Sequence, residues 1–212
     1  MSLPRTQTPR FIYFDLGNVL LNFDHEIACR QMAAIAGVEP RAIRELVFQS
    51  DLQWQYECGQ VTSREFFDHF REQTRSEPEF AELLHAASDI FTLNLSIVPL
   101  VAHLKAAGHR LGILSNTCDA HWQFVTAGRY WTVPDAFSVH ALSFELGAMK
   151  PDPKIYESAA ELAGCEPGEI FFMDDREDNV QGALAAGFDA VLFRDTPTLA
   201  RDLRKRGVIC NF

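Results

Sequence analysis

Short runs of apolar residues alternate with segments of helical spacing along most of the chain. The apolar runs cover residues 11–14, 111–114, 137–142, 170–173 and 190–193. Each run is continuous rather than alternating, which is typical of strands that are buried on both faces of a parallel sheet. Residues 99–107 and 180–186 have helical spacing, and each is followed by a glycine at which a helix can end. This order predicts a doubly wound α/β fold, with a parallel sheet and helices on both faces.

Residues 25–95 interrupt this rhythm because they contain no convincing strand. Apolar residues recur at helical spacing over 27–36 and 42–48, and Thr62 with Glu65 fits the pattern of a capping box. We therefore expect a helical cap inserted after the first strand, where it can close over a site and exclude water. The predicted division is residues 1–24 and 96–212 for the α/β core and residues 25–95 for the cap.

Composition narrows the classes of partner. Of the 212 residues, 19 are Lys or Arg and 29 are Asp or Glu, which gives a net charge of -10. A negative surface repels nucleic acid, and no stretch approaches the roughly 20 apolar residues that a membrane span needs. The five cysteines are odd in number and widely spaced, which favours free thiols in a reducing cytosol. We expect a cytoplasmic protein that binds neither nucleic acid nor membranes, and the oligomeric state stays open.

Acidic residues follow two of the predicted strands. Asp15 comes directly after the first apolar run, and Asp174 and Asp175 come after the fourth. In a doubly wound sheet, ligands bind beyond the carboxyl ends of the strands. Asp15 could serve there as a nucleophile, or simply begin a turn with Gly17 and Asn18. The adjacent carboxylates repel one another unless a cation or solvent offsets them, and carboxylates and phosphate oxygens are preferred ligands of Mg²⁺.

Three further positions could hold a phosphate group. Ser115 and Asn116 follow the second run, where a hydroxyl and backbone N–H groups can bind an anion, although an ordinary helix N-cap looks the same. Lys150 precedes a capped helix and could neutralise a carboxylate and a phosphate, or be an ordinary surface lysine. Together these residues suit phosphoryl transfer, which needs a nucleophile, positioning and charge neutralisation. In this interpretation Asp15 attacks phosphorus, Asp15 and Asp175 hold Mg²⁺, and Lys150 and Ser115 hold the remaining oxygens.

These residues resemble the haloacid dehalogenase superfamily of phosphohydrolases. The four motifs, in order, are residues 14–19 (FDLGNV), residues 114–116 (LSN), Lys150-Pro151, and Asp174-Asp175 with Asn179. The resemblance covers nearly the whole chain and implies a Rossmann-like core, a helical cap and a required Mg²⁺. It implies Asp15 and Lys150 as catalytic residues. It implies that the metal is held by Asp15, the carbonyl of Gly17, Asp174 and Asp175. It implies that the phosphate is bound by Gly17, Asn18, Ser115, Asn116 and Lys150.

The chain departs from this family at Gly17. The family's phosphatases usually carry an Asp two residues after the nucleophile, where it acts as general acid and base. A glycine keeps the backbone carbonyl but not the proton donor, and the pattern is similar to a branch that includes bacterial glucose-1-phosphate phosphatases. General acid–base help is worth about 10²–10⁴-fold, so we expect sugar 1-phosphates and aryl phosphates to be hydrolysed faster than alkyl phosphates. Asp24 and His25 are candidate replacements for the donor.

The predicted function is Mg²⁺-dependent hydrolysis of a phosphate monoester on a small metabolite, such as a sugar phosphate, through an aspartyl-phosphate on Asp15. Two alternatives stay open. A haloacid dehalogenase would use the aspartate to attack carbon without a metal, and a catalytically weak or idle binding or regulatory protein would fit the loss at Gly17. The choice of substrate lies in the cap and the nearby loops, where candidate contacts are Trp54, Tyr56, Arg64, Arg129, Tyr130 and Trp131.

Overall fold

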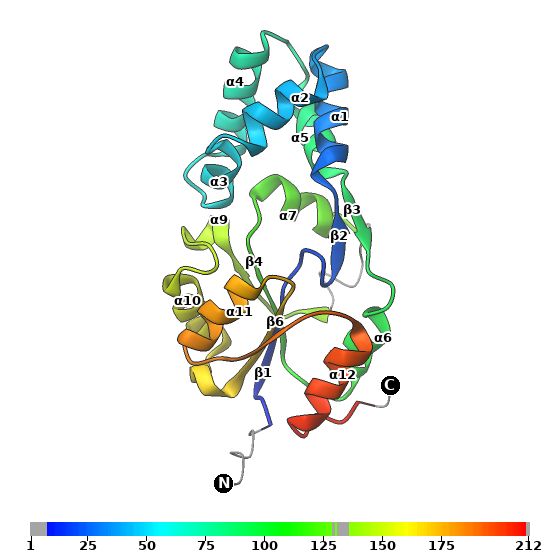
Figure 1. Ribbon diagram of the computed structural model, residues 1–212, viewed down its shortest axis with the longest axis vertical. Coiled ribbons are helices and arrows are strands. Elements are labelled where there is room, and N and C mark those ends of the chain that lie inside the picture. Colours follow the sequence, from blue (N-terminus) through cyan, green and yellow to red (C-terminus); the bar gives the residue numbers. More distant parts are fainter. Residues whose placement is uncertain (1–7, 129, 131–135, 211–212) are drawn as a thin grey trace.

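The core of the molecule is a five-stranded parallel sheet in the order β5-β4-β1-β6-β7 (Figure 1). The computed structural model describes residues 8–128, 130 and 136–210. The strands are β1 (Phe11–Phe14), β4 (Leu111–Ser115), β5 (Val139–Leu142), β6 (Ile170–Asp174) and β7 (Asp189–Leu192). Each strand overlaps one of the predicted apolar runs, and β1 coincides with its run.

Both faces of the sheet are buried under helices. Ile12 and Phe14 lie in one apolar cluster, whereas Phe11 and Tyr13 lie in another, because successive side chains of a strand point to opposite faces. The first cluster is covered by α6 (Val98–Ala106), α7 (Asp119–Thr126) and α12 (Thr196–Lys205), and the second by α10 (Pro153–Ala163) and α11 (Glu177–Ala185). This arrangement confirms the predicted fold. Among the described residues, no helix has the length and apolar character needed to cross a membrane.

Helix α10 begins and ends where the sequence indicates. The Asp152 side chain accepts a hydrogen bond from the backbone N–H of Lys154 at 2.9 Å, and Pro153 occupies the first turn. Gly164 ends the helix with φ of 60°, a left-handed conformation that glycine adopts without steric cost. Local sequence therefore determines where the chain after Lys150 turns into a helix.

Residues 25–88 form a helical layer over the carboxyl ends of the strands, at the top of Figure 1. Its elements are α1 (His25–Ala36), α2 (Pro40–Ile43), the π-helical turn η1 (Arg44–Phe48), α3 (Leu52–Glu57), α4 (Ser63–Thr74) and α5 (Phe80–Ser88). These helices pack around an apolar cluster of their own, to which Cys118 and Ala120 from the core also contribute. Thr62 and Glu65 form the predicted capping box at the start of α4. We call residues 25–95 the cap.

The prediction that the cap contains no strand was wrong. Strand β3 (Phe91–Leu93) pairs antiparallel with β2 (Leu21–Phe23). Both strands have three residues, which are too few to show a period of two in the sequence. The two strands are also separated along the chain by almost the whole cap. The chain therefore leaves the core for the cap and returns through one paired ribbon (Figure 1).

Candidate active site

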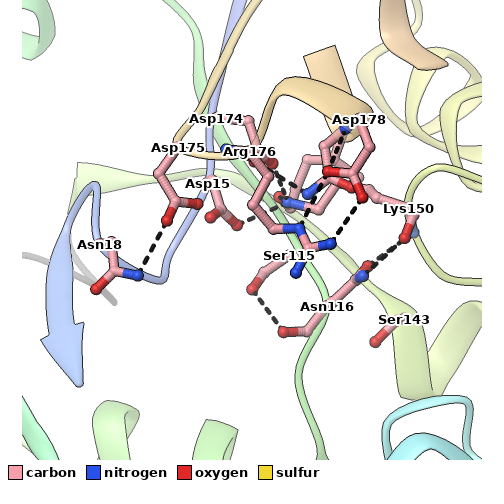
Figure 2. Close-up of polar contacts among 12 residues, drawn as sticks. Asp15, Asn18, Ser115, Asn116, Ser143, Lys150, Asp174, Asp175, Arg176 and Asp178 are labelled. Carbon is pink, nitrogen blue, oxygen red and sulfur yellow. Dashed lines mark hydrogen bonds and ion pairs between the residues drawn. The ribbon is translucent and has the colours of Figure 1, made fainter. Parts of the chain in front are cut away.

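The carboxyl ends of three neighbouring strands bring the predicted site residues together (Figure 2). Asp15 follows β1, and the strands on either side of β1 end at Ser115 and Asp174. All three residues are buried. The backbone N–H of Asp15 donates to the carbonyl of Met173 at 3.0 Å, so the pairing of β1 with β6 continues to this point and fixes Asp15 beside Asp174.

Lys150 joins two of these carboxylates. Its Nζ donates to Asp15 Oδ1 at 2.7 Å, to Asp174 Oδ2 at 2.6 Å and to the carbonyl of Leu114 at 2.9 Å. An ammonium group has three donors, so all of them are engaged. Burial alone would lower the pKa of Lys150, but the two carboxylates outweigh burial and raise that pKa above its usual value. Lys150 is therefore a fixed internal cation, 5% exposed, rather than a surface lysine.

The Asn116 side chain holds the backbone of Lys150. Its Nδ2 donates to the Lys150 carbonyl at 2.9 Å, and its Oδ1 accepts from the Lys150 N–H at 2.7 Å. The Ser115 hydroxyl makes a longer contact, 3.3 Å, with the carbonyl of Asn116. Ser143, which the sequence analysis did not identify, accepts from the N–H of Thr117 and donates to its carbonyl, at 2.9 and 3.0 Å. The loop after β4 is thus held by hydrogen bonds to Lys150 and to Ser143. Both the nitrogen and the oxygen of the Asn116 amide are bonded to protein.

Asp174 and Asp175 are held differently. Asp174 Oδ1 accepts from the backbone N–H of Arg176 at 2.9 Å and from Asn179 Nδ2 at 3.0 Å. Asp175 is partly exposed and lines the cavity described below, and its Oδ2 accepts from Asn18 Nδ2 at 2.9 Å. Asn18 has φ of 54°, a conformation that asparagine tolerates better than most residues, and its N–H is bonded within its own loop. Protein donors therefore occupy Asp174 more fully than Asp175.

The three carboxylates suit a hard divalent cation. One oxygen from each of Asp15, Asp174 and Asp175 lies within 4.8 Å of the others, and Figure 2 shows the carboxyl groups of Asp15 and Asp175 side by side. Lys150 offsets only one of the three negative charges. Burial raises the pKa of Asp15 to about 7; Lys150 opposes this effect, whereas Asp174 and Asp175 add to it. A cation would favour the ionised carboxylates, and oxygen donors are the ligands that Mg²⁺ prefers, so the donor set fits this ion.

The space beside Gly17 is filled by an aromatic ring. A β-carbon on Gly17 would lie 2.7 Å from Cε1 of Phe23, which is shorter than a normal contact. The ring of Phe23 is held in turn by those of His25 and Phe91, whose centroids lie 5.0 and 6.1 Å away. Position 17 therefore accepts no side chain unless that ring moves, and nothing in the sequence pattern marks Phe23 as its occupant.

A cavity of about 760 Å³ lies between the core and the cap. Asp15 and Lys150 line it from the core, and Trp54, Glu57 and Gln60 line it from the cap. Trp54 is 51% exposed, so its indole is available to a ligand. Glu57 and Gln60 were not singled out from the sequence, because no pattern separates them from the other polar residues of the cap.

The other candidates from the sequence differ in how they relate to the cavity. Asp24 accepts a hydrogen bond as the N-cap of α1, and His25 lines the cavity next to it. Tyr56 is buried with its hydroxyl bonded inside the protein, and Arg64 forms an exposed ion pair along α4. Tyr130 is buried, whereas two of the named residues lie outside the described part of the chain: Arg129 and Trp131.

Comparison with known proteins gives a consistent set of matches. Residues 10–187 match the family model of haloacid dehalogenase-like hydrolases. Among solved structures, a haloacid dehalogenase family enzyme from Bacteroides thetaiotaomicron, in complex with magnesium and inorganic phosphate, has a TM-score of 0.77 and 29% sequence identity. The match covers 87% of this chain and 94% of that chain.

Curated relatives include phosphatases and longer proteins. The D-ribitol-5-phosphate phosphatase of Bacteroides thetaiotaomicron is 23% identical over 185 residues, which are 84% of this chain and 88% of that protein. Bifunctional epoxide hydrolase 2 of Rattus norvegicus is 27% identical over 127 residues, or 59% of this chain. The aligned part makes up only 23% of that epoxide hydrolase, so the likeness extends to a fraction of its length.

Proposed function

The chain belongs to the haloacid dehalogenase-like hydrolases, and on that premise we propose that it hydrolyses a phosphate monoester of a small metabolite through an aspartyl-phosphate on Asp15. The observation that carries the proposal is the buried group in which Lys150 lies 2.7 Å from Asp15 and 2.6 Å from Asp174, beside a cavity large enough for a metabolite. The phosphatase among the relatives and the neighbour that binds magnesium and phosphate support it.

The reaction has two steps at phosphorus. First an oxygen of Asp15 bonds to phosphorus while the bond to the ester oxygen breaks. Water then attacks the same phosphorus, so that inorganic phosphate leaves and Asp15 is restored. Lys150 orients Asp15 and offsets negative charge in both steps, and Asn116 keeps Lys150 in place. The Ser115 hydroxyl, whose internal contact is long at 3.3 Å, is free to turn toward a phosphate oxygen.

The metal set comes from the same strand ends. Asp15 and Asp175 would hold Mg²⁺ directly, together with the carbonyl of Gly17. Asp174 already accepts three hydrogen bonds, so we assign it to orienting Lys150 and to a contact through water. When bound, Mg²⁺ would supply positive charge that offsets the repulsion of the Asp15 carboxylate and the phosphate.

Phosphate release from a panel of phosphate esters, with and without Mg²⁺, tests this function in the wild type and in Asp15→Asn. We expect release that depends on Mg²⁺ and is lost in the variant, because an amide of the same shape cannot form the acyl phosphate. Release that survives in Asp15→Asn would exclude the aspartyl-phosphate. No release from any ester by the folded protein would favour a catalytically idle binding protein, an alternative suggested by the missing carboxyl group at Gly17. Metal-independent halide release from a haloacid would favour a dehalogenase.

A further inference from the structure

Hydrolysis of an unactivated phosphate ester needs a proton donor, and the core strands do not provide one at the expected position. Gly17 has no side chain, and a β-carbon added there would lie 2.7 Å from Cε1 of Phe23. The candidates for a donor are therefore the other side chains that line the cavity. Beyond the carboxylates of the metal set, five carboxyl and imidazole groups line the cavity in the described part of the chain: His25, Glu57, His121, Asp152 and Asp178.

Most of these groups are engaged or carry no proton to give. Asp178 is paired with Arg176, with their charged atoms 2.7 Å apart, and Asp152 caps α10. Burial lowers the pKa of His121 to about 4, so its ring is neutral at pH 7. Burial also lowers the pKa of His25, although neighbouring carboxylates oppose the shift. Burial therefore disfavours the charged form of both imidazoles, and of the five groups we select the carboxyl group of Glu57.

Glu57 is the last residue of α3, and the residue before it anchors this end of the helix to the core. The Tyr56 hydroxyl accepts a hydrogen bond from the backbone N–H of Ala120 at 3.2 Å. It also lies 2.7 Å from the hydroxyl of Ser63, which donates to Asp119 Oδ2 at 2.7 Å. Two groups of α7 thus hold the cap on one side of Glu57.

A second anchor follows two residues after Glu57. Gly59, with φ of 68°, packs against the short helix α9 (Ser143–Leu146) of the core. The approach is so close that a β-carbon on Gly59 would lie 2.1 Å from the carbonyl oxygen of Phe144. Because Glu57 lies between two points of contact with the core, its backbone cannot move away from the cavity without breaking one of them.

The surroundings of Glu57 favour its protonated form. Gln53, one turn earlier on α3, donates to Glu57 Oε1 at 2.7 Å. Burial raises the pKa of Glu57, and Gln53, Arg176 and Lys150 oppose this effect only in part. The charged and titratable groups that interact with Glu57 come from its own loop and from the core: Cys58, Cys118, Lys150 and Arg176. A carboxyl group of this kind keeps its proton closer to neutral pH than an exposed glutamate, as a general acid requires.

We propose that Glu57 is the general acid and base of the reaction, taking the place of the carboxyl group absent at Gly17. In the first step an oxygen of Asp15 bonds to phosphorus, the bond from phosphorus to the ester oxygen breaks, and protonated Glu57 gives its proton to that oxygen. In the second step the Glu57 carboxylate takes a proton from water. The water oxygen bonds to phosphorus, the bond to Asp15 breaks, and phosphate leaves. This inference rests on the proposed phosphatase function.

Glu57→Gln tests the role, because glutamine keeps the size of the side chain and an acceptor for Gln53 but transfers no proton. The assay compares an alkyl phosphate with p-nitrophenyl phosphate, both with Mg²⁺. For the alkyl ester we expect kcat/KM to fall by about 10²–10⁴-fold. For the aryl ester, whose leaving group needs no proton, we expect a burst of one nitrophenolate per site followed by slow turnover, because water is no longer activated. Glu57→Asp should retain more alkyl phosphatase activity than Glu57→Gln.

Asp51→Asn is a matched control from the start of the same helix. Asp51 is exposed, makes no capping hydrogen bond and lies outside the cavity, so this variant should keep wild-type rates on both esters. Thermal unfolding checks that Glu57→Gln is folded. Three results would overturn the role of Glu57. Glu57→Gln could lose equal activity on both esters without a burst, or it could lose activity on neither ester. In the third result, His25→Gln rather than Glu57→Gln loses activity selectively on the alkyl ester. Failure of the phosphatase proposal is a separate result, since the wild type would then release no phosphate.

Discussion

Gly59 is the point at which the cap rests on α9, and replacing it with alanine measures what that contact contributes. The new β-carbon would lie 2.1 Å from the carbonyl oxygen of Phe144 and 3.0 Å from its carbonyl carbon. Both are backbone atoms, so no side-chain rotation relieves the clash and the cap must shift away from the core. Overpacking of this kind costs about 1–3 kcal/mol, and a left-handed backbone costs any residue with a β-carbon about 1–2 kcal/mol more.

Gly37→Ala is the matched control for Gly59→Ala. Gly37 is also an exposed glycine of the cap, with φ of 66° against 68° at Gly59, but a β-carbon added to it would meet no atom within 4 Å beyond its chain neighbours. The left-handed backbone penalty is therefore shared, and so is the effect of alanine on the entropy of the unfolded chain. The difference between the two variants isolates the contact with Phe144, and we expect Gly59→Ala to be the less stable by about 1–3 kcal/mol.

Equilibrium unfolding in urea gives both free energies, provided the two variants share one m-value. Phosphatase assays of the same samples test the consequence for the site. Because Glu57 lies two residues from Gly59, Gly59→Ala should lose activity on the alkyl phosphate, whereas Gly37→Ala should keep it. Equal losses of stability in the two variants would refute the reasoning, since the Phe144 contact would then contribute nothing.

Three further substitutions test separate features of the structure. Lys150→Met leaves Asp15 and Asp174 buried without their cation, so we expect a loss of about 3–5 kcal/mol in urea unfolding and no phosphate release. Burial lowers the pKa of His121 to about 4, against 6.5 in the unfolded chain. The unfolded chain therefore takes up a proton first as pH falls, and the free energy of unfolding decreases between pH 7 and pH 5. In urea unfolding, His121→Gln should make that decrease smaller by about 2 kcal/mol. Tyr56→Phe removes the hydroxyl that joins the cap to α7 and should cost about 1–3 kcal/mol by the same measurement.

The strands and the residues at their ends could be predicted because both depend on short stretches of sequence. A continuous apolar run that ends in a polar residue marks the carboxyl end of a buried strand, and parallel strands bring those ends to one edge of the sheet. Asp15, Ser115 and Asp174 lie together for this reason. Their separate roles stay predictions, since geometry alone does not measure catalysis.

Features that depend on contacts between distant segments could not be predicted. The ribbon joins β2, which precedes the cap, to β3, which lies near the end of the cap, and each strand has three residues. Ser143 holds the loop after β4 from another element, and no motif surrounds it. Lys150 looked equally like a surface residue until the fold placed it between two carboxylates. In each case the partner lies far away along the chain, where spacing carries no information.

At Gly17 the sequence lacks a carboxyl group, and the structure shows what lies beside that position instead. The sequence reveals that a carboxyl group is missing, and the structure shows that the Phe23 ring lies 2.7 Å from the place where a β-carbon on Gly17 would stand. Glu57, which lines the same cavity from the cap, is the donor that we assign in its place. If Glu57 is that donor, the core alone is an incomplete site, because seating the cap on α7 and α9 brings the acid to the ester. Catalysis on unactivated esters then depends also on Tyr56 and Gly59, although neither of them lines the cavity.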